Sequence, residues 1–89
     1  MVVVEVFTRK DCPFCPDAKE VVERVAKKFK NVTVKEVDVE SKEGKKKADF
    51  LEIVTVPVVL INNDVQFEGV PREELLRSAI KEELEKEKE

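Results

Sequence analysis

Hydrophobic and polar residues follow two different periods in the first third of the chain. Residues 2–8 are β-branched or aromatic except for Glu5, and such a run is typical of a central strand buried on both faces. From Cys12 the period becomes that of an amphipathic helix, with charged residues opposite one apolar stripe. The stripe consists of Ala18, Val21, Val22, Val25, Ala26 and Phe29. We therefore expect a strand over residues 2–8 and a helix that begins within a residue or two of Cys12.

The segment after this helix predicts a second strand and a second helix. Residues 32–39 are rich in β-branched residues, and their alternation slips once near Lys35-Glu36. Ser41 can cap a helix of about 10 residues. Gly44 in the first turn disfavours that helix, because glycine loses more backbone freedom there than other residues do. The inward-facing residues of the helix would be Ala48 and Leu51.

The last third of the chain predicts two short strands and a closing helix. Residues 56–61 and 65–68 read as strands, and residues 62–64 are Asn-Asn-Asp, which tolerate the positive φ of a tight turn. The two strands should therefore be antiparallel neighbours. Pro71 is expected as an early residue of the last helix. Its apolar stripe would be Leu75, Leu76, Ala79, Ile80 and Leu84.

The order of these elements predicts an α/β fold. A βαβ unit followed by αββα gives a four-stranded mixed sheet in the order 2-1-3-4, with helices on both faces and a right-handed first crossover. With 89 residues, the chain is expected to form a single domain over residues 1–89 with one hydrophobic core.

Composition adds expectations about partners and location. Apolar and charged residues each make up 42% of the chain, which suits a globule with a small core and a charged surface. The net charge of −3 argues against a nucleic-acid partner, and residues 45–47, the only basic run, read as a solvated helix face. The apolar start lacks a basic leader and is broken by Glu5, so we expect no membrane association and a cytoplasmic protein. Many Lys and Glu with few Asn and Gln are typical of heat-adapted proteins.

The chemistry is expected at Cys12-Pro13-Phe14-Cys15, which lies between a buried strand and an amphipathic helix. A Cys-X-X-Cys pair in that context predicts a redox motif. The unpaired N–H groups and positive dipole end of a helix stabilise a thiolate, so Cys12 should be the attacking thiol. Pro13 is expected at the first helical position. Cys15 would lie one turn inside on the same face, within bridging distance, as the resolving thiol.

Other interpretations of these residues remain open from the sequence alone. The cysteine pair could form a zinc half-site, although a closed site normally needs four ligands and the chain has no His. A copper carrier is disfavoured, because such carriers use a βαββαβ order. Phe14 could equally pack on the core at the helix start, and Pro57 could be an ordinary proline at the start of a strand.

Two further segments give the chain a family resemblance. Cys-Pro-Phe-Cys at residues 12–15, Thr-Val-Pro at residues 55–57 and Phe-Glu-Gly at residues 67–69 follow each other in that order. Together they resemble the thioredoxin/glutaredoxin superfamily over residues 3–84. Pro16, directly after the second cysteine, is a feature shared with the small glutaredoxin-like thioredoxins of archaea. The resemblance implies a thioredoxin fold.

The resemblance also implies roles for individual residues. Pro57 would be a cis-proline facing the cysteine pair, and the backbone of Val56 would pair with an extended substrate segment. Gly69 would keep the substrate groove low, and Phe14 would add apolar docking surface. The implied substrate-binding residues are Pro13, Phe14, Thr55, Val56, Pro57 and Gly69, beside a redox-active disulfide between Cys12 and Cys15.

Three departures from the family pattern limit the transfer. Val6 stands where thioredoxins have a buried Asp that manages the proton of the resolving thiol. Glu68-Gly69-Val70 replaces the Gly-Gly pair of glutathione-using glutaredoxins. Asp11 replaces the tryptophan before the first cysteine, and an anion there should partly oppose the helix dipole.

The function expected from these motifs is that of a thiol-disulfide oxidoreductase, a protein disulfide reductase serving electron transport and cell redox homeostasis without a cofactor or metal. Its partners would be disulfide-containing proteins and an external electron donor, either thioredoxin reductase or glutathione, and the protein would act as a monomer. The alternatives are a glutathione-dependent glutaredoxin and, from another class, a non-catalytic metal-binding Cys-X-X-Cys module.

Overall fold

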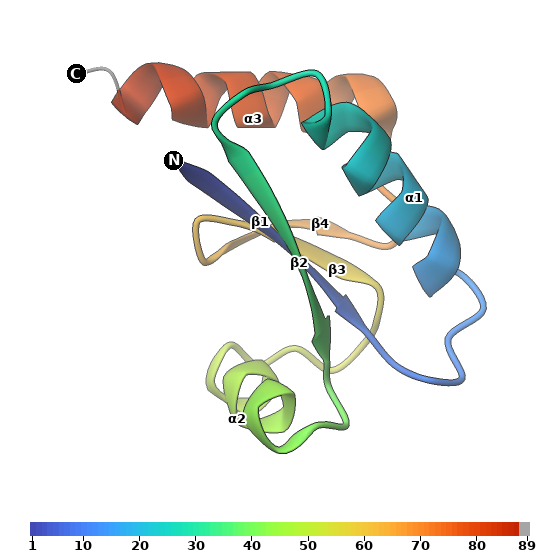
Figure 1. Ribbon diagram of the computed structural model, residues 1–89. Helices are drawn as coiled ribbons and strands as arrows, with labels where there is room; N and C mark the ends of the chain where they lie inside the picture. Colours follow the sequence, from blue (N-terminus) through green and yellow to red (C-terminus); the bar gives the residue numbers. More distant parts are fainter. Residues whose placement is uncertain (88–89) are drawn as a thin grey trace.

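The computed structural model describes residues 1–87 as a four-stranded sheet with helices on both faces (Figure 1). The strands are β1 (Val2–Thr8), β2 (Val32–Asp38), β3 (Val58–Ile61) and β4 (Asp64–Glu68), and the helices are α1 (Cys15–Ala26), α2 (Lys42–Phe50) and α3 (Glu73–Glu87). The strand order is β2-β1-β3-β4, with β2 parallel to β1 and the other pairs antiparallel. This order and the sequence of elements confirm the predicted α/β architecture.

The core lies in two layers on either side of β1. Side chains of β1 alternate between the faces, so Val4 and Val6 pack under α1 and α3, whereas Phe7 packs on the side of α2. The larger layer contains Val2, Val4, Val6, Ala18, Val22, Val25, Val59, Ile61, Leu76 and Ile80. The smaller one contains Phe7, Ala48, Val58 and Leu60. In Figure 1, α2 accordingly lies apart from α1 and α3, near the end of the sheet where β1 and β2 finish.

The slip in the alternation of β2 has a simple structural cause. Val32 and Val34 pack against the larger core layer, while Val37 and Val39 pack against the smaller one. The strand keeps its regular period, but the face that is covered changes halfway along, because α1 and α2 cover opposite faces at opposite ends. Glu36 therefore lies on the same face as Val34, beyond the part that the core covers.

The start of α2 requires Gly44, although a glycine in the first turn was expected to disfavour this helix. The hydroxyl of Ser41 accepts a hydrogen bond from the Gly44 N–H at 3.0 Å and donates one to the Asp38 carbonyl at 2.6 Å. A Cβ at Gly44 would overlap that carbonyl oxygen. The predicted cap at Ser41 is confirmed, and Gly44 is needed for the close approach of the cap to the end of β2.

The hairpin between β3 and β4 has a two-residue loop. Asn62 and Asn63 both have positive φ, 49° and 70°, which is the requirement of a tight type I′ turn. The Asn62 side chain also accepts a hydrogen bond from the Val3 N–H at 2.9 Å. The predicted antiparallel hairpin is confirmed. β3 begins at Val58 rather than at Val56, and β4 begins at Asp64 rather than at Val65.

Two helices begin later than the sequence pattern predicted. α1 starts at Cys15, with Phe14 as its N-cap residue, so Pro13 lies outside the helix. Pro16 takes the helix-starting place, because a proline in the first turn needs no hydrogen-bond partner for its nitrogen. Pro71 is buried two residues before α3, and Leu75 on the predicted apolar stripe is 52% exposed.

A charged pair lies in the middle of the sheet. Glu5 is 5% exposed, and both its carboxylate oxygens accept from the Lys47 Nζ, at 2.8 and 2.6 Å. The same Nζ donates to the Asn63 side chain at 3.2 Å. The interpretation of the basic run as a purely solvated helix face is therefore wrong for Lys47, which neutralises a buried carboxylate. None of the helices within residues 1–87 is long and apolar enough to cross a membrane.

We predict that Lys47→Met destabilises the protein by about 2 kcal/mol, because it leaves Glu5 buried without its counter-charge. The value is below that of a fully buried pair, because the Lys47 side chain remains 36% exposed. Guanidinium denaturation at neutral pH measures it. Lys46→Met, an exposed neighbour with the same change of charge, is the control and should change stability by less than about 0.5 kcal/mol. Equal effects of the two variants would contradict the role of the pair.

Candidate active site

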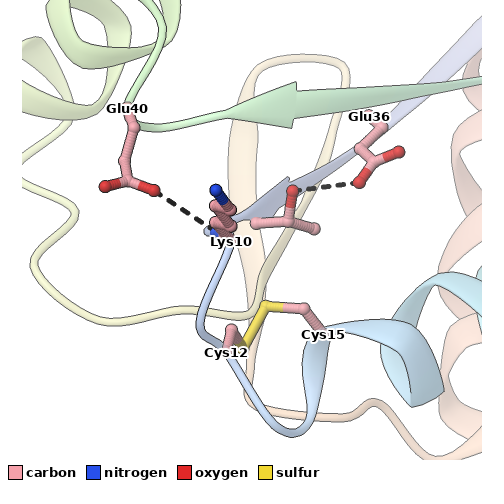
Figure 2. The surroundings of a disulfide bond; sticks show 6 residues. Lys10, Cys12, Cys15, Glu36 and Glu40 are labelled. Atoms are coloured by element: carbon pink, nitrogen blue, oxygen red, sulfur yellow. Dashed lines mark hydrogen bonds between the residues drawn. A yellow bond between two sulfur atoms is a disulfide. The ribbon is translucent and has the colours of Figure 1, made fainter.

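Cys12 and Cys15 form a disulfide where the chain enters α1 (Figure 2). Their Cα atoms are 5.4 Å apart, and the two residues are 8% and 4% exposed. The Cys12 N–H donates to the Arg9 carbonyl at 3.2 Å, which turns the chain toward the helix. The Phe14 carbonyl accepts from Ala18, the first bond of α1. The Cys12–Cys15 disulfide that the family resemblance implied is therefore present, and the two residues lie within the bridging distance that their spacing predicted.

α1 begins at a later residue than the sequence predicted, which changes where the two cysteines lie relative to the helix. Cys15 is the first residue of α1, whereas Cys12 lies three residues before it, in the preceding turn. Both side chains are still at the N-terminal end of the helix, where unpaired N–H groups and the dipole favour a negative sulfur. Asp17 in the first turn also matches the dipole.

A groove of about 720 Å³ opens beside the disulfide, on the side of β2. It is lined by the ends of β1 and β2, the loops that follow them and the first turns of α1. Its lining contains charges of both signs. The residues are Thr8, Arg9, Lys10, Cys12, Cys15, Pro16, Lys19, Glu36, Asp38 and Glu40.

Glu36 is held in this groove by two partners. The hydroxyl of Thr8, which is buried at the end of β1, donates to Glu36 Oε2 at 3.1 Å. Lys19 Nζ, from α1, lies 2.9 Å from Glu36 Oε1. The Lys19 hydrogen bond lowers the pKa of Glu36 below its ordinary value, an effect that partial burial opposes and the Thr8 bond reinforces. The same contact raises the pKa of Lys19.

The sequence analysis did not single out Thr8, Lys19 or Glu36. Two signals were available: Lys19 follows Cys15 by four residues, the spacing of neighbours on one helix face, and Glu36 marks the slip in the alternation of β2. The sequence alone does not show that Lys19 and Glu36 are close, because their contact depends on the register that pairs Glu36 with Val6.

The loop that carries Cys12 is tied to the end of β2. The Lys10 N–H donates to Glu40 Oε1 at 3.3 Å, and the Glu40 N–H donates to the Asp38 side chain at 2.8 Å. Figure 2 shows Glu36 on β2 and Glu40 just beyond its end, both on the β2 side of the disulfide. These bonds fix the loop without contacting Glu36.

The other predicted site residues lie toward β3. The Val56–Pro57 peptide bond is cis, as the family resemblance implied. Phe7 pairs with Val58, so Pro57 lies one residue beyond that pair, at the end of β1. The Gly69 N–H donates to the Pro57 carbonyl at 2.8 Å, and Gly69 has a φ of 89°, which suits glycine. The ladders thus bring residues 55–57 and Gly69 together near the loop that carries the cysteines.

Phe14 and Pro13 remain on the surface. Phe14 is 61% exposed, so the alternative in which it packs on the core is wrong. Thr55 is exposed and Val56 is partly buried. Pro57, between these residues and β3, is buried.

The sheet order, the disulfide at the start of α1 and the cis-proline before β3 define the class of thioredoxin-fold disulfide proteins. Comparison with known proteins agrees. The glutaredoxin family model matches residues 4–66, most of the chain. The chain belongs to the thioredoxin/glutaredoxin superfamily, and it is a thiol-disulfide oxidoreductase.

Several archaeal relatives match almost the whole chain. A thioredoxin of Methanocaldococcus jannaschii is 44% identical over 84 residues, covering 93% of this chain and 96% of the relative. A probable thioredoxin of Methanothermobacter thermautotrophicus is 38% identical over 86 residues, covering 96% and 99%. Among solved structures, chloroplastic thioredoxin z has a TM-score of 0.76 at 19% identity, covering 92% of this chain and 77% of that one. It shows the same fold.

The residues between 1 and 87 contain no group of three or more His, Cys, Asp or Glu that could hold a metal ion. In the oxidised structure each cysteine sulfur is bonded to the other.

We predict that the Glu36 carboxyl titrates below 4.5, its ordinary pKa, and that Lys19→Met raises its midpoint, because the bond from Lys19 is the largest cause of the shift. Carboxyl-detected NMR across a pH series measures both. Because the pKa of Glu36 is lower in the folded than in the unfolded protein, its ionised form stabilises the fold at pH values above the unfolded-state pKa. This contribution is lost as the pH falls through the folded-state pKa. Glu20→Gln, at an exposed carboxylate that pairs with Arg24, should leave the Glu36 midpoint unchanged. An unchanged midpoint in Lys19→Met would contradict the assignment.

Proposed function

We propose that this protein is a protein disulfide reductase, with Cys12 as the attacking thiolate and Cys15 as the resolving thiol. The observation that carries the proposal is the disulfide at the start of α1, which lies beside a charged groove and close in sequence to the exposed ring of Phe14. Cys12 lies outside the helix and is the more exposed of the two cysteines, whereas Cys15 belongs to the helix. The place of Cys12 before the helix supports its proposed role as the sulfur that attacks an incoming disulfide.

The reaction is a two-step thiol-disulfide exchange. The Cys12 thiolate attacks one sulfur of the substrate disulfide, which forms a mixed disulfide and releases the other substrate sulfur as a thiolate. Cys15 then loses its proton and attacks the Cys12 sulfur, which releases the second substrate thiolate and forms the Cys12–Cys15 bond. Two electrons pass to the substrate, and the two cysteine protons end on its thiols. An external dithiol or thiol reverses the process and regenerates the reduced protein.

The proposed substrate site consists of Pro13, Phe14, Thr55, Val56, Pro57 and Gly69. The ladder between β1 and β3 ends at Val58, so the backbone of Val56 lies beyond it, where an extended substrate segment can pair with it. Gly69 adds no side chain above this segment, and an added Cβ there would meet no atom within 4 Å. The exposed ring of Phe14 offers apolar contact.

The remaining parts of the proposal concern partners and location. Disulfide-containing proteins are the proposed substrates, and thioredoxin reductase or glutathione is the proposed electron donor. Residues 1–89 are proposed to form one thioredoxin-like domain that acts as a monomer in the cytosol, where a reducing pool can sustain the dithiol form.

A glutathione-dependent glutaredoxin is the second candidate, because the matching family model is that of glutaredoxin. The segment Glu68-Gly69-Val70 lacks the Gly-Gly pair of that subfamily, which favours the first candidate. We predict that insulin reduction is at least about tenfold faster with NADPH and a flavin-dependent thioredoxin reductase than with glutathione and its reductase at matched protein. Faster turnover of a glutathione mixed disulfide would instead establish the glutaredoxin activity.

We predict that the two cysteine variants behave differently. Cys12→Ser removes the attacking thiolate, so turnover should fall to background and no substrate adduct should form. Cys15→Ser retains attack but cannot resolve it, so the protein should accumulate as a mixed disulfide with its substrate. Mass spectrometry of non-reduced samples distinguishes the two. In the reduced wild-type protein, limiting iodoacetamide should label Cys12 first.

The double variant Cys12→Ser/Cys15→Ser is the control for non-specific adducts. If both single variants trap substrate equally, or if Cys15 alkylates faster, the roles are wrong. If neither variant traps substrate and the reduced protein purifies with a metal ion, the metal-binding alternative replaces the reductase.

A further inference from the structure

The groove on the β2 side of the disulfide has no part in the proposed binding of substrate. The charged groups that face it come from every element around it: Arg9 and Lys10 after β1, Lys19 on α1, Glu36 and Asp38 on β2, and Glu40 after β2. Lys19 and Glu36 pair with each other across the groove, from a helix to a strand. The pair lines the same groove as both cysteines, and an exposed ion pair contributes little to stability, so its charges are considered for their effect on the thiols.

Helix geometry places Lys19 on the same face of α1 as Cys15. The two residues are four apart on α1, so their side chains are neighbours on one face. Helical side chains also lean toward the N-terminus, which carries Lys19 toward the turn that holds Cys15. Both residues line the same groove.

Glu36 is oriented by the end of β1. The Thr8 hydroxyl is buried and fixes one carboxylate oxygen at 3.1 Å, while Lys19 takes the other at 2.9 Å. Contacts from β1 and α1, the two elements that the cysteine loop connects, thus fix the position of the Glu36 carboxylate. The groove of about 720 Å³ that these groups line together with both cysteines has room for several water molecules.

We propose that the Lys19–Glu36 pair controls the loss of the proton from the Cys15 thiol in the resolving step. Both are positioning residues, and the inference rests on the proposed function, in which Cys15 must become a thiolate. The Cys15 proton passes to water in the groove and from there to the substrate thiolate released in the first step. The ammonium of Lys19 favours the Cys15 thiolate, and the carboxylate of Glu36 opposes it. Because the two charges oppose each other, loss of either one changes how readily Cys15 gives up its proton in the resolving step.

The test uses charge changes of opposite sign in a Cys12→Ser background, where Cys15 is the one remaining thiol. The ultraviolet absorbance of the thiolate is followed against pH. Glu36→Gln leaves Lys19 unpaired, so the thiol midpoint should fall by about 0.5 pH unit. Lys19→Met leaves Glu36 unpaired, so the midpoint should rise by a similar amount. The double variant Lys19→Met/Glu36→Gln should return to within about 0.2 unit of the parent.

In the protein with both cysteines, release of substrate from the mixed disulfide should follow the same pattern. Near neutral pH it should be about threefold faster in Glu36→Gln and about threefold slower in Lys19→Met, since the thiolate fraction changes tenfold per pH unit. The matched control is Glu40→Gln, which removes the same charge from the same groove but contacts the Lys10 amide. Its shift should be less than half that of Glu36→Gln.

A structural role would move both single variants in the same direction, because either change breaks the pair. Shifts of one sign, no shift, or an equal shift in Glu40→Gln would each overturn the proposal. Failure of the reductase function is seen separately, as the absence of a trapped adduct in Cys15→Ser, which does not involve Lys19 or Glu36.

Discussion

The burial of β1 on both faces is the constraint on which the rest of the structure depends. Val4 and Val6 are sealed under α1 and α3, and Phe7 is sealed on the other face, so the strand is fixed at the centre of the sheet. Its ladders then place β2 on one side and β3 on the other. Because the chain passes from Thr8 into the cysteine loop, these ladders also fix what flanks the disulfide: Pro57 toward β3 and Glu36 toward β2.

Because β1 is buried on both faces, the charged side chain of Glu5 is buried with it. Lys47 offsets it from α2, the helix with the smaller apolar layer beneath it. The pair therefore both satisfies a buried carboxylate and ties α2 to the sheet. Asn63, one of the two residues that form the β3–β4 turn, accepts from the same ammonium and links the hairpin to this cluster.

The periods of the sequence predicted the elements and their order, because α1 buries one stripe of residues and β1 is apolar on both faces. The start of α1 was misplaced because two prolines, Pro13 and Pro16, both suit a helix start, and only the backbone shows which is used. Lys19 and Glu36 could not be predicted as a pair, since their contact depends on the register of β2 against β1. The cis bond at Pro57 came from family resemblance, as local sequence does not determine it.

The pairing of Val6 with Glu36 places a carboxylate on β2 next to the position at which thioredoxins have a buried Asp. Val6 is completely buried in the larger core layer, where a carboxylate would lose its hydration. Its neighbour Glu36 lies on an edge strand with its side chain 46% exposed and with Lys19 beside it. A carboxylate so placed has a lowered pKa and stays charged near neutral pH. It can therefore act on Cys15 as a fixed charge balanced by Lys19, while water in the groove carries the proton.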